Sequence, residues 1–358
     1  MDEIKSQLVL NIIKKFEDKW NWHLLSSNTN LTITHILTYP NKPWNWFELS
    51  KHINFNDIIK YPNFSWDWYS ISINKSVTID HIIQHKNKPW VWYLLSMNKN
   101  ITITHIEKFS ELPWNWNYLS NNPNITIDFV LKNQDKNWCW KFLSKNININ
   151  IILRYIDKPW DWHFISNKCS IEHLLAYPDK DWNWFLVSKN PNITMSHIKK
   201  FKLFWNSQGL SMNPNITIDD VIQNLDIRWD FTLLSRNPNI TINDMLKYPT
   251  LPWYWIDICR NPNITIDNII NNIDKPWDFN YLSLNKNITL EDVIKYPDLQ
   301  WNWKYLSYNP SILDVSKDLE NMDKAARIIQ KYWLKCYYDP NNIICKRRLQ
   351  REFTNLYK

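Results

Sequence analysis

Histidine and aspartate recur at one position of a regular pattern in this sequence, and they are the first residues to test for chemistry. Neighbouring members lie one period apart, which for packed helices means ~8–10 Å, too far to share a metal ion at ~2.1 Å bond lengths. The position therefore predicts a polarised partner-binding surface; the alternative is a solvated face whose aspartates favour helix N-termini. Its members are His35, His81, His105, His173, His197, Asp220, Asp244 and Asp292.

The other polar residues do not form a pattern that is typical of an enzyme active site. A serine recurs at one position in twelve units, and Cys259 replaces it in the thirteenth, so a capping hydroxyl explains it better than a catalytic nucleophile does. The single glycine excludes phosphate-binding loops that depend on glycine. Five cysteines form no CxxC pair, which indicates reduced thiols. The sequence predicts a non-enzymatic protein without a cofactor or a structural metal.

A tryptophan-rich repeat fills most of the chain and must position all of these residues. The consensus reads PWNWxxLSxNPNITIxxIIxYPDK, and thirteen units follow one another at intervals of 22 to 24 residues. The leading tryptophans are Trp20, Trp44, Trp66, Trp90, Trp114, Trp138, Trp160, Trp182, Trp205, Trp229, Trp253, Trp277 and Trp301.

Each unit predicts two short helices. Asn or Asp after the leading Trp suits the N-cap of a first helix, which runs from the second Trp to the Ser. That segment holds only about one and a half turns at ~3.6 residues per turn, so 3₁₀ geometry stays open for one of the two elements. The Thr after NPN caps a second helix, which stops at Tyr-Pro because the residue before proline is driven out of the α region.

Two helices of this length cannot bury a core alone, so the units must stack. The expected fold is all-α, an α-solenoid of about thirteen two-helix repeats that forms a curved rod on the order of 100 Å long. We expect three parts: an N-terminal capping helix over 1–19, the repeats over 20–315, and a basic C-terminal helix and tail over 316–358.

The tryptophans themselves have two interpretations. Aromatic rows can bind sugars and cationic ligands, which would make the chain a glycan-binding module. The second Trp of a unit is replaced by Phe231 and Phe279, however, and packing positions tolerate such an exchange. We therefore favour a core role. Asparagine and isoleucine have A/T-rich codons, so part of the asparagine excess is attributed to the genome.

Four units depart from the consensus. The units at Trp44, Trp138 and Trp160 lack two residues in the NPNIT loop. The unit at Trp205 has Ser207 in place of its second Trp and carries Gly209. Bends or partner sites are expected there, with imperfect repeats of no functional consequence as the alternative.

The net charge of +7 is concentrated at the C-terminus. Residues 317–358 carry ten basic and five acidic residues, a net +5, so the remaining chain is nearly neutral. Nucleic-acid association through this tail is a further alternative, with candidate phosphate contacts at Lys346, Arg347, Arg348 and Arg351. The segment around Ile329 and Gln330 partly resembles a calmodulin-binding IQ motif. Because Leu334, Lys335 and Asp339 depart from that motif, a capping helix is favoured over calmodulin binding.

The repeat motif WNWxxLSxNPNIT, followed by the segment AARIIQKYW, resembles a group of repeat proteins encoded by mimivirus-type giant viruses of amoebae. The spacing LSxNPxxxxxxxxxxYP is also similar to the leucine-rich repeat variant, whose iron–sulfur cysteine cluster has no counterpart in this sequence. These resemblances imply a solenoid fold and no activity for any residue. Together with the absence of a signal peptide or apolar span, they favour a scaffold that binds a viral or host protein in the host cytoplasm or the virion.

Overall fold

The computed structural model describes residues 2–322, 324, 327 and 330, and every regular element in that part of the chain is a helix. The chain divides into two compact units. The smaller comprises residues 1–15 and 313–358, and its described elements are α1 (Asp2–Lys15) and a helical stretch over 316–322. The larger comprises residues 16–312 and contains all thirteen repeats. The IQ-like segment mostly, and the four basic candidates of the tail wholly, lie outside the described residues.

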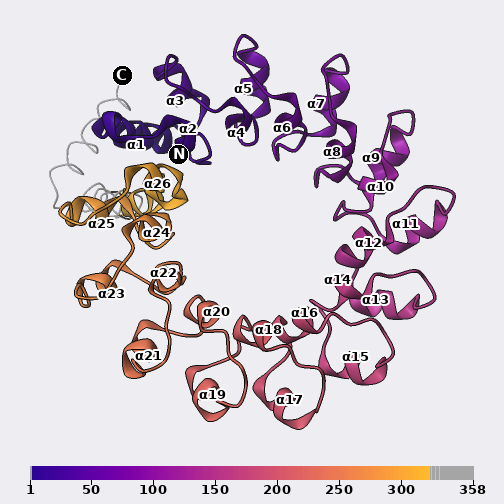
Figure 1. Cartoon of the computed structure of the whole chain (residues 1–358). Coiled ribbons are helices and arrows are strands. Elements are labelled where there is room, and N and C mark those ends of the chain that lie inside the picture. Colours follow the sequence, from indigo (N-terminus) through magenta and orange to yellow (C-terminus); the bar gives the residue numbers. More distant parts are fainter. Residues whose placement is uncertain (1, 323, 325–326, 328–329, 331–358) are drawn as a thin grey trace, which may run out of the picture. The chain divides into compact units, whose positions relative to one another are not determined.

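The first helix of each repeat belongs to one row, which forms the inner side of the larger unit in Figure 1. We call these the inner helices. They are α2 (Trp22–Leu25), α4 (Trp46–Ser50), α6 (Trp68–Ser72), α8 (Trp92–Met97), α10 (Trp116–Leu119), α12 (Trp140–Asn146), α14 (Trp162–Ile165), α16 (Trp184–Lys189), α18 (Ser207–Ser211), α20 (Phe231–Ser235), α22 (Trp255–Ile258), α24 (Phe279–Leu284) and α26 (Trp303–Tyr308).

The second helix of each of the first twelve repeats lies outside this row (Figure 1). These outer helices are α3 (Ile33–Thr38), α5 (Phe55–Lys60), α7 (Ile79–Gln84), α9 (Ile103–Lys108), α11 (Ile127–Lys132), α13 (Ile149–Arg154), α15 (Ile171–Ala176), α17 (Met195–Lys200), α19 (Ile218–Gln223), α21 (Ile242–Lys247), α23 (Ile266–Ile270) and α25 (Leu290–Lys295). Two 3₁₀ turns, η1 (Glu17–Lys19) and η2 (Pro310–Leu313), flank the repeats.

The predicted caps are confirmed for both helices of the repeat. The side chain of Asn115 accepts from the backbone N–H of Tyr118 at the start of α10, and Thr126 accepts from Phe129 at the start of α11. The outer helix α21 ends at Lys247, and its C-cap residue Tyr248 stands directly before a proline. The 3₁₀ alternative is wrong for the repeats, because inner and outer helices are all α-helical. Side-chain caps let such short segments close α-type hydrogen bonds.

The expected open rod is wrong, because the larger unit closes on itself. Helix α2 of the first repeat packs against α26 of the thirteenth. The backbone N–H of Asn21 donates to Oγ of Ser307 at 2.9 Å, and the rings of Trp20 and Trp303 meet edge to face at 5.2 Å. The thirteen repeats together bring the chain back to its starting point, so they form a ring (Figure 1).

The irregular repeats do not interrupt this ring. Gly209 lies in α18 where an added Cβ would overlap the carbonyl oxygen of Phe185 and lie 2.8 Å from Cβ of Ser188. The missing side chain therefore lets α18 approach α16 closely. Ser207 leaves Trp229 without the aromatic neighbour that other leading tryptophans have, yet the hydrogen bond from the N–H of Asn206 to Ser188 continues the inter-repeat contacts at 2.8 Å. The expectation of bends or partner sites at these repeats stays a prediction.

Candidate functional site

The histidines and aspartates of the recurring position cap the outer helices. In α3, Nδ1 of His35 accepts from the backbone N–H of Thr32 at 2.9 Å, and in α19 the carboxylate of Asp220 accepts from Thr217 at 3.0 Å. All eight take part in such capping boxes, in which the side chain at N3 reaches back to the N-cap. His35 is fully buried. In each of the eight residues one polar side-chain atom already accepts the hydrogen bond of the capping box. Partner binding by these residues stays a prediction.

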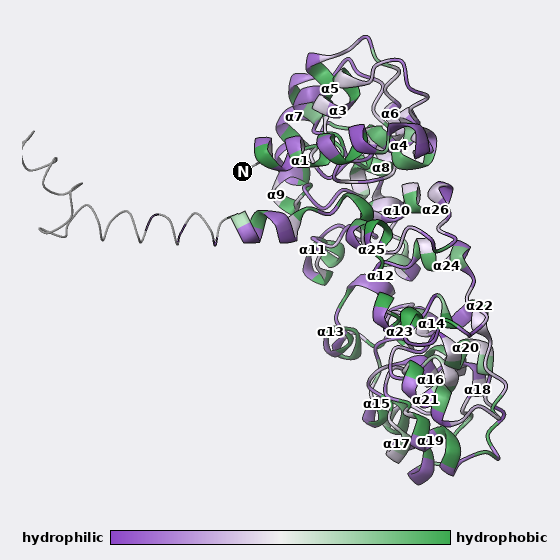
Figure 2. Ribbon diagram, turned by 90° about the vertical axis from the view of Figure 1, so that its left-hand side faces the viewer, coloured by the Kyte–Doolittle hydropathy of each residue, from purple (hydrophilic) through white to green (hydrophobic). Residues whose placement is uncertain are grey.

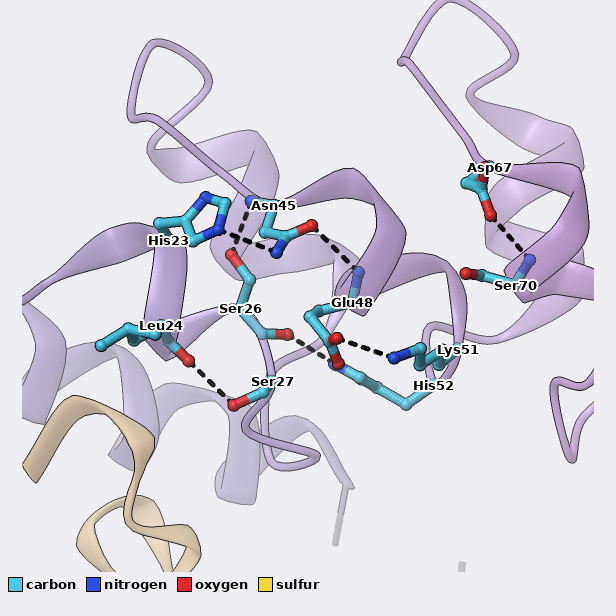
Figure 3. A network of polar contacts seen from close by, with 10 residues as sticks. All are labelled: His23, Leu24, Ser26, Ser27, Asn45, Glu48, Lys51, His52, Asp67 and Ser70. Atoms are coloured by element: carbon cyan, nitrogen blue, oxygen red, sulfur yellow. Dashed lines mark hydrogen bonds and ion pairs between the residues drawn. The ribbon is translucent and has the colours of Figure 1, made fainter. Parts of the chain in front are cut away.

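The recurring serine joins neighbouring repeats. Oγ of Ser26 donates to the carbonyl of Trp22 at 2.8 Å. It also accepts from the backbone N–H of Asn45 in the next repeat at 2.9 Å, the contact drawn in Figure 3. The inter-repeat bond recurs at every interface of the ring, with Ser307 and Asn21 closing the circle and Sγ of Cys259 serving as acceptor once. The hydroxyl is a buried link between repeats as well as the predicted cap. Sequence reasoning missed this second function.

The first asparagine of NPN forms a second buried ladder. Nδ2 of Asn122 donates to the carbonyls of Ser96, Asn98 and Ile101 in the preceding repeat at 2.9–3.1 Å. Its Oδ1 accepts from the N–H of Asn124 at 2.9 Å. Because a buried carbonyl left without a donor costs ~1–3 kcal/mol, these asparagines are structural, and codon bias is an insufficient explanation for them. The signal was in the sequence, since the residue recurs two positions after the serine.

Two of the three shortened repeats replace this asparagine, by His52 and Lys168, and the third keeps it as Asn146; all three side chains reach a carbonyl of the preceding repeat. Nε2 of His52 donates to the carbonyl of Ser26 at 2.9 Å (Figure 3), and Nδ2 of Asn146 reaches that of Ser120 at 3.2 Å. Nζ of Lys168 donates to the carbonyl of Ser144 at 2.6 Å. Burial lowers the pKa of Lys168 to about 8. The ladder thus survives the loss of two residues in each loop.

His52 gives the ring a pH-dependent contribution to stability. Burial lowers its pKa, and its buried Nδ1 has no hydrogen-bond partner. The folded chain therefore keeps His52 neutral at a pH where the unfolded chain already binds a proton. Because the unfolded state then holds more protons, the free energy of unfolding falls as pH drops below ~6.5, by at most about 1.4 kcal/mol per pH unit.

We expect the variant His52→Asn, which restores the residue of the longer repeats, to lose less stability than the wild type between pH 7.5 and 5.5. Urea melts across that range measure the difference. The other histidines are common to both proteins and cancel. Parallel pH profiles of the two proteins would contradict the assignment of a buried neutral imidazole.

The two tryptophan rows have different contacts. The indole N–H of a leading Trp donates to a backbone carbonyl about five residues earlier, as Trp138 does to Asn133 at 2.8 Å. The second Trp meets the next leading Trp edge to face, as Trp116 meets Trp138 with ring centroids 5.2 Å apart and an interplanar angle of 86°. Eight leading tryptophans are buried, which confirms their predicted core role. Phe can replace the second Trp, because this edge contact needs no N–H donor.

Lysines cover several of the second tryptophans. Nζ of Lys42 lies 4.9 Å from the ring centroid of Trp22, and Lys88 and Lys180 stand in the same way over the second tryptophans of other repeats. A neighbouring indole edge and an ammonium group already contact these rings. Little ring face is left for a sugar to stack on.

The inner helices carry a separate row of aromatic side chains. These lie at positions that the repeat consensus leaves variable. The row spans α4, α6, α8, α10 and α12 and consists of Phe47, Tyr69, Tyr93, Tyr118 and Phe142. Neighbouring ring centroids are 4.9 to 6.4 Å apart. Phe47 and Tyr69 are 42% and 44% exposed. A side-chain hydrogen bond with Tyr69 raises the pKa of Tyr93. We call this set the aromatic row.

Within the described residues, no three His, Cys, Asp or Glu side chains gather closely enough to hold a metal ion. The helices of that same part of the chain also lack the combined length and apolarity needed to cross a bilayer. In Figure 2 hydrophobic and hydrophilic residues mix along the short helices. Comparisons with protein-family models, with curated proteins and with solved structures found no match.

Proposed function

We propose that this chain is a non-enzymatic scaffold whose aromatic row binds a protein partner through an extended segment with apolar or aromatic side chains. The observation that carries the proposal is the continuity of the row over five consecutive repeats, with Phe47 and Tyr69 more than two fifths exposed. Contiguous exposed apolar groups mark interaction sites, and tyrosine is enriched among the residues that dominate binding energy.

The closed ring of repeats fixes the spacing between the side chains of the aromatic row. Each aromatic side chain of the row belongs to an inner helix whose Leu or Ile and the Ser that follows it are fully buried, as Leu119 and Ser120 are beside Tyr118. The hydrogen bonds of the serine and asparagine ladders join these helices from repeat to repeat. A preorganised row loses little conformational freedom on binding, which favours affinity.

The resemblance to giant-virus repeat proteins extends this proposal to a viral or host partner in the infected cell or the particle. Glycan binding is not favoured, because the second tryptophans are already in contact with lysines and indole edges. Nucleic-acid association rests on the basic tail, outside the described residues, and stays a prediction of the sequence.

Selection of binding peptides from a random display library tests the proposal. We expect the selected peptides to be rich in apolar and aromatic residues and to lose at least tenfold in affinity for the double variant Tyr93→Ser/Tyr118→Ser. The control variant Tyr254→Ser removes a 54% exposed tyrosine outside the row and should bind as the wild type does.

Unchanged melting temperatures must accompany these measurements, so that lost binding reflects the missing rings. The proposal would be overturned if the selected peptides bound the double variant as tightly as the wild type. It would also be overturned if the library yielded no binding peptides.

A further inference from the structure

A buried carboxylate in α22 organises two arginines that lie outside the aromatic row. The side chain of Asp257 is 8% exposed. Arg236 donates to its Oδ1 through both Nε and Nη2, and Nη1 of Arg260 lies 3.7 Å from the same oxygen. One negative charge thus faces two positive charges, and the group keeps a net positive charge.

The second arginine is held in place by an aromatic ring of the next repeat. The guanidinium carbon of Arg260 lies 3.9 Å from the ring centroid of Tyr281 in α24, a cation–π contact that does not use the hydrogen-bonding capacity of the guanidinium N–H groups. Arg260 is 39% exposed, so the guanidinium is accessible to a ligand.

A pocket of about 270 Å³ opens beside this arginine. It is lined by Arg260, Pro262, Tyr281, Leu284, Asn285 and Lys286. No carboxylate is among these lining residues. The amide of Asn285 is already used, because Nδ2 donates to the carbonyls of Cys259 and Asn261 and Oδ1 accepts from Asn287. The pocket therefore offers two cations and an apolar wall, and no polar side chain that would repel an anion.

We propose that this pocket binds an oxyanion, a carboxylate or a phosphate, carried on a small apolar or aromatic group. The guanidinium of Arg260 and the ammonium of Lys286 bind the oxyanion by charge-assisted hydrogen bonds. Pro262, Leu284 and the ring of Tyr281 contact the apolar part of the ligand. The volume exceeds what a bare oxyanion fills, which is the reason for assigning a ligand with an apolar body. This site is independent of the aromatic row.

Three small probes test the site by saturation-transfer NMR on the full chain: phenyl phosphate, benzoate and uncharged benzamide. We expect one or both anions to bind, benzamide to bind at least tenfold more weakly, and anion affinity to fall as salt is added. The preferred anion distinguishes a phosphate ligand from a carboxylate ligand.

Variants then assign the binding to the pocket. Lys286→Met and Arg260→Gln should each weaken anion binding about tenfold, as expected for a lost charge-assisted hydrogen bond. The matched control is Lys99→Met, because Lys99 occupies the same repeat position as Lys286 and the unit before it has Ile73 in place of the arginine. The double variant Tyr93→Ser/Tyr118→Ser should bind the probes normally, which separates this site from the proposed peptide site.

Equal anion binding by Lys286→Met and the wild type would overturn the proposal, as would equal binding of benzamide and the anions. Lys286 is an exposed surface residue, so its variant keeps the test open even if Arg260→Gln does not fold. The proposal would also be overturned if Lys99→Met weakened anion binding as much as Lys286→Met does, because the binding would then depend on general surface charge.

Discussion

Replacing Trp138 by alanine should lower the free energy of unfolding by about 3–5 kcal/mol, the range for buried aromatic side chains. Trp138 is 9% exposed and meets Trp116 of the preceding repeat edge to face. Its removal leaves a cavity and also deprives the carbonyl of Asn133 of the indole N–H that it accepts at 2.8 Å. Urea unfolding followed by circular dichroism measures the loss.

Phenylalanine variants separate these two effects. Trp138→Phe keeps an aromatic ring but removes one of the two donors to the carbonyl of Asn133, the other being the backbone N–H of Lys136 at 3.2 Å. The lost hydrogen bond should cost about 0.5–1.5 kcal/mol beyond the lost area. Trp116→Phe is the matched control, because the second position contains Phe279 in a natural repeat, and that ring still meets the edge of Trp301 at 5.4 Å. If both Phe variants cost the same, the indole N–H is not what makes tryptophan necessary at the leading position.

The sequence was sufficient to predict the repeat and its helices. Thirteen leading tryptophans set the register, and caps such as Asn115 and Thr126 begin helices where the pattern placed them. These features depend on local rules, because a cap contacts its own helix within three residues. The all-α solenoid was therefore predictable from one unit of the consensus.

The ladders and the aromatic row were harder to predict for different reasons. Within the ring the serine and asparagine links join residues 17 to 26 positions apart, and the sequence shows the recurrence of Ser26 or Asn122 without showing what each contacts. The aromatic row lies at positions that the consensus leaves variable, with Tyr93 one place earlier in its repeat than Tyr118. Only the curvature of the ring brings such positions side by side.

Ring closure could not be derived from the consensus, because it depends on the angle between neighbouring repeats. That angle is set by side-chain packing at each interface, and a small change in each would leave an open rod. One signal was nevertheless present. The thirteenth repeat keeps Trp303 and Ser307, two residues that a repeat uses to join its successor, whereas a terminal repeat of an open solenoid has a polar outer face.

Replacing Trp303 by alanine should therefore destabilise the ring as strongly as a change in its interior, by about 3–5 kcal/mol. The ring of Trp303 contacts Trp20 at 5.2 Å and Phe16 at 5.1 Å, and Nζ of Lys19 lies 5.0 Å from its centroid. In an open solenoid the same side chain would be at a free end and its removal would cost little.

Amide hydrogen exchange at Asn21 reports on the closing interface directly. In the wild type its N–H donates to Ser307, 286 positions away along the chain, just as the N–H of Asn45 donates to Ser26 within the ring. The two amides should exchange at similar rates in the wild type, since a ring has no terminal repeat to fray. Trp303→Ala should speed exchange at Asn21 much more than at Asn45. Fast exchange at Asn21 in the wild type, or a rate that the substitution leaves unchanged, would contradict closure, because only the contact with the thirteenth repeat protects the amide of the first.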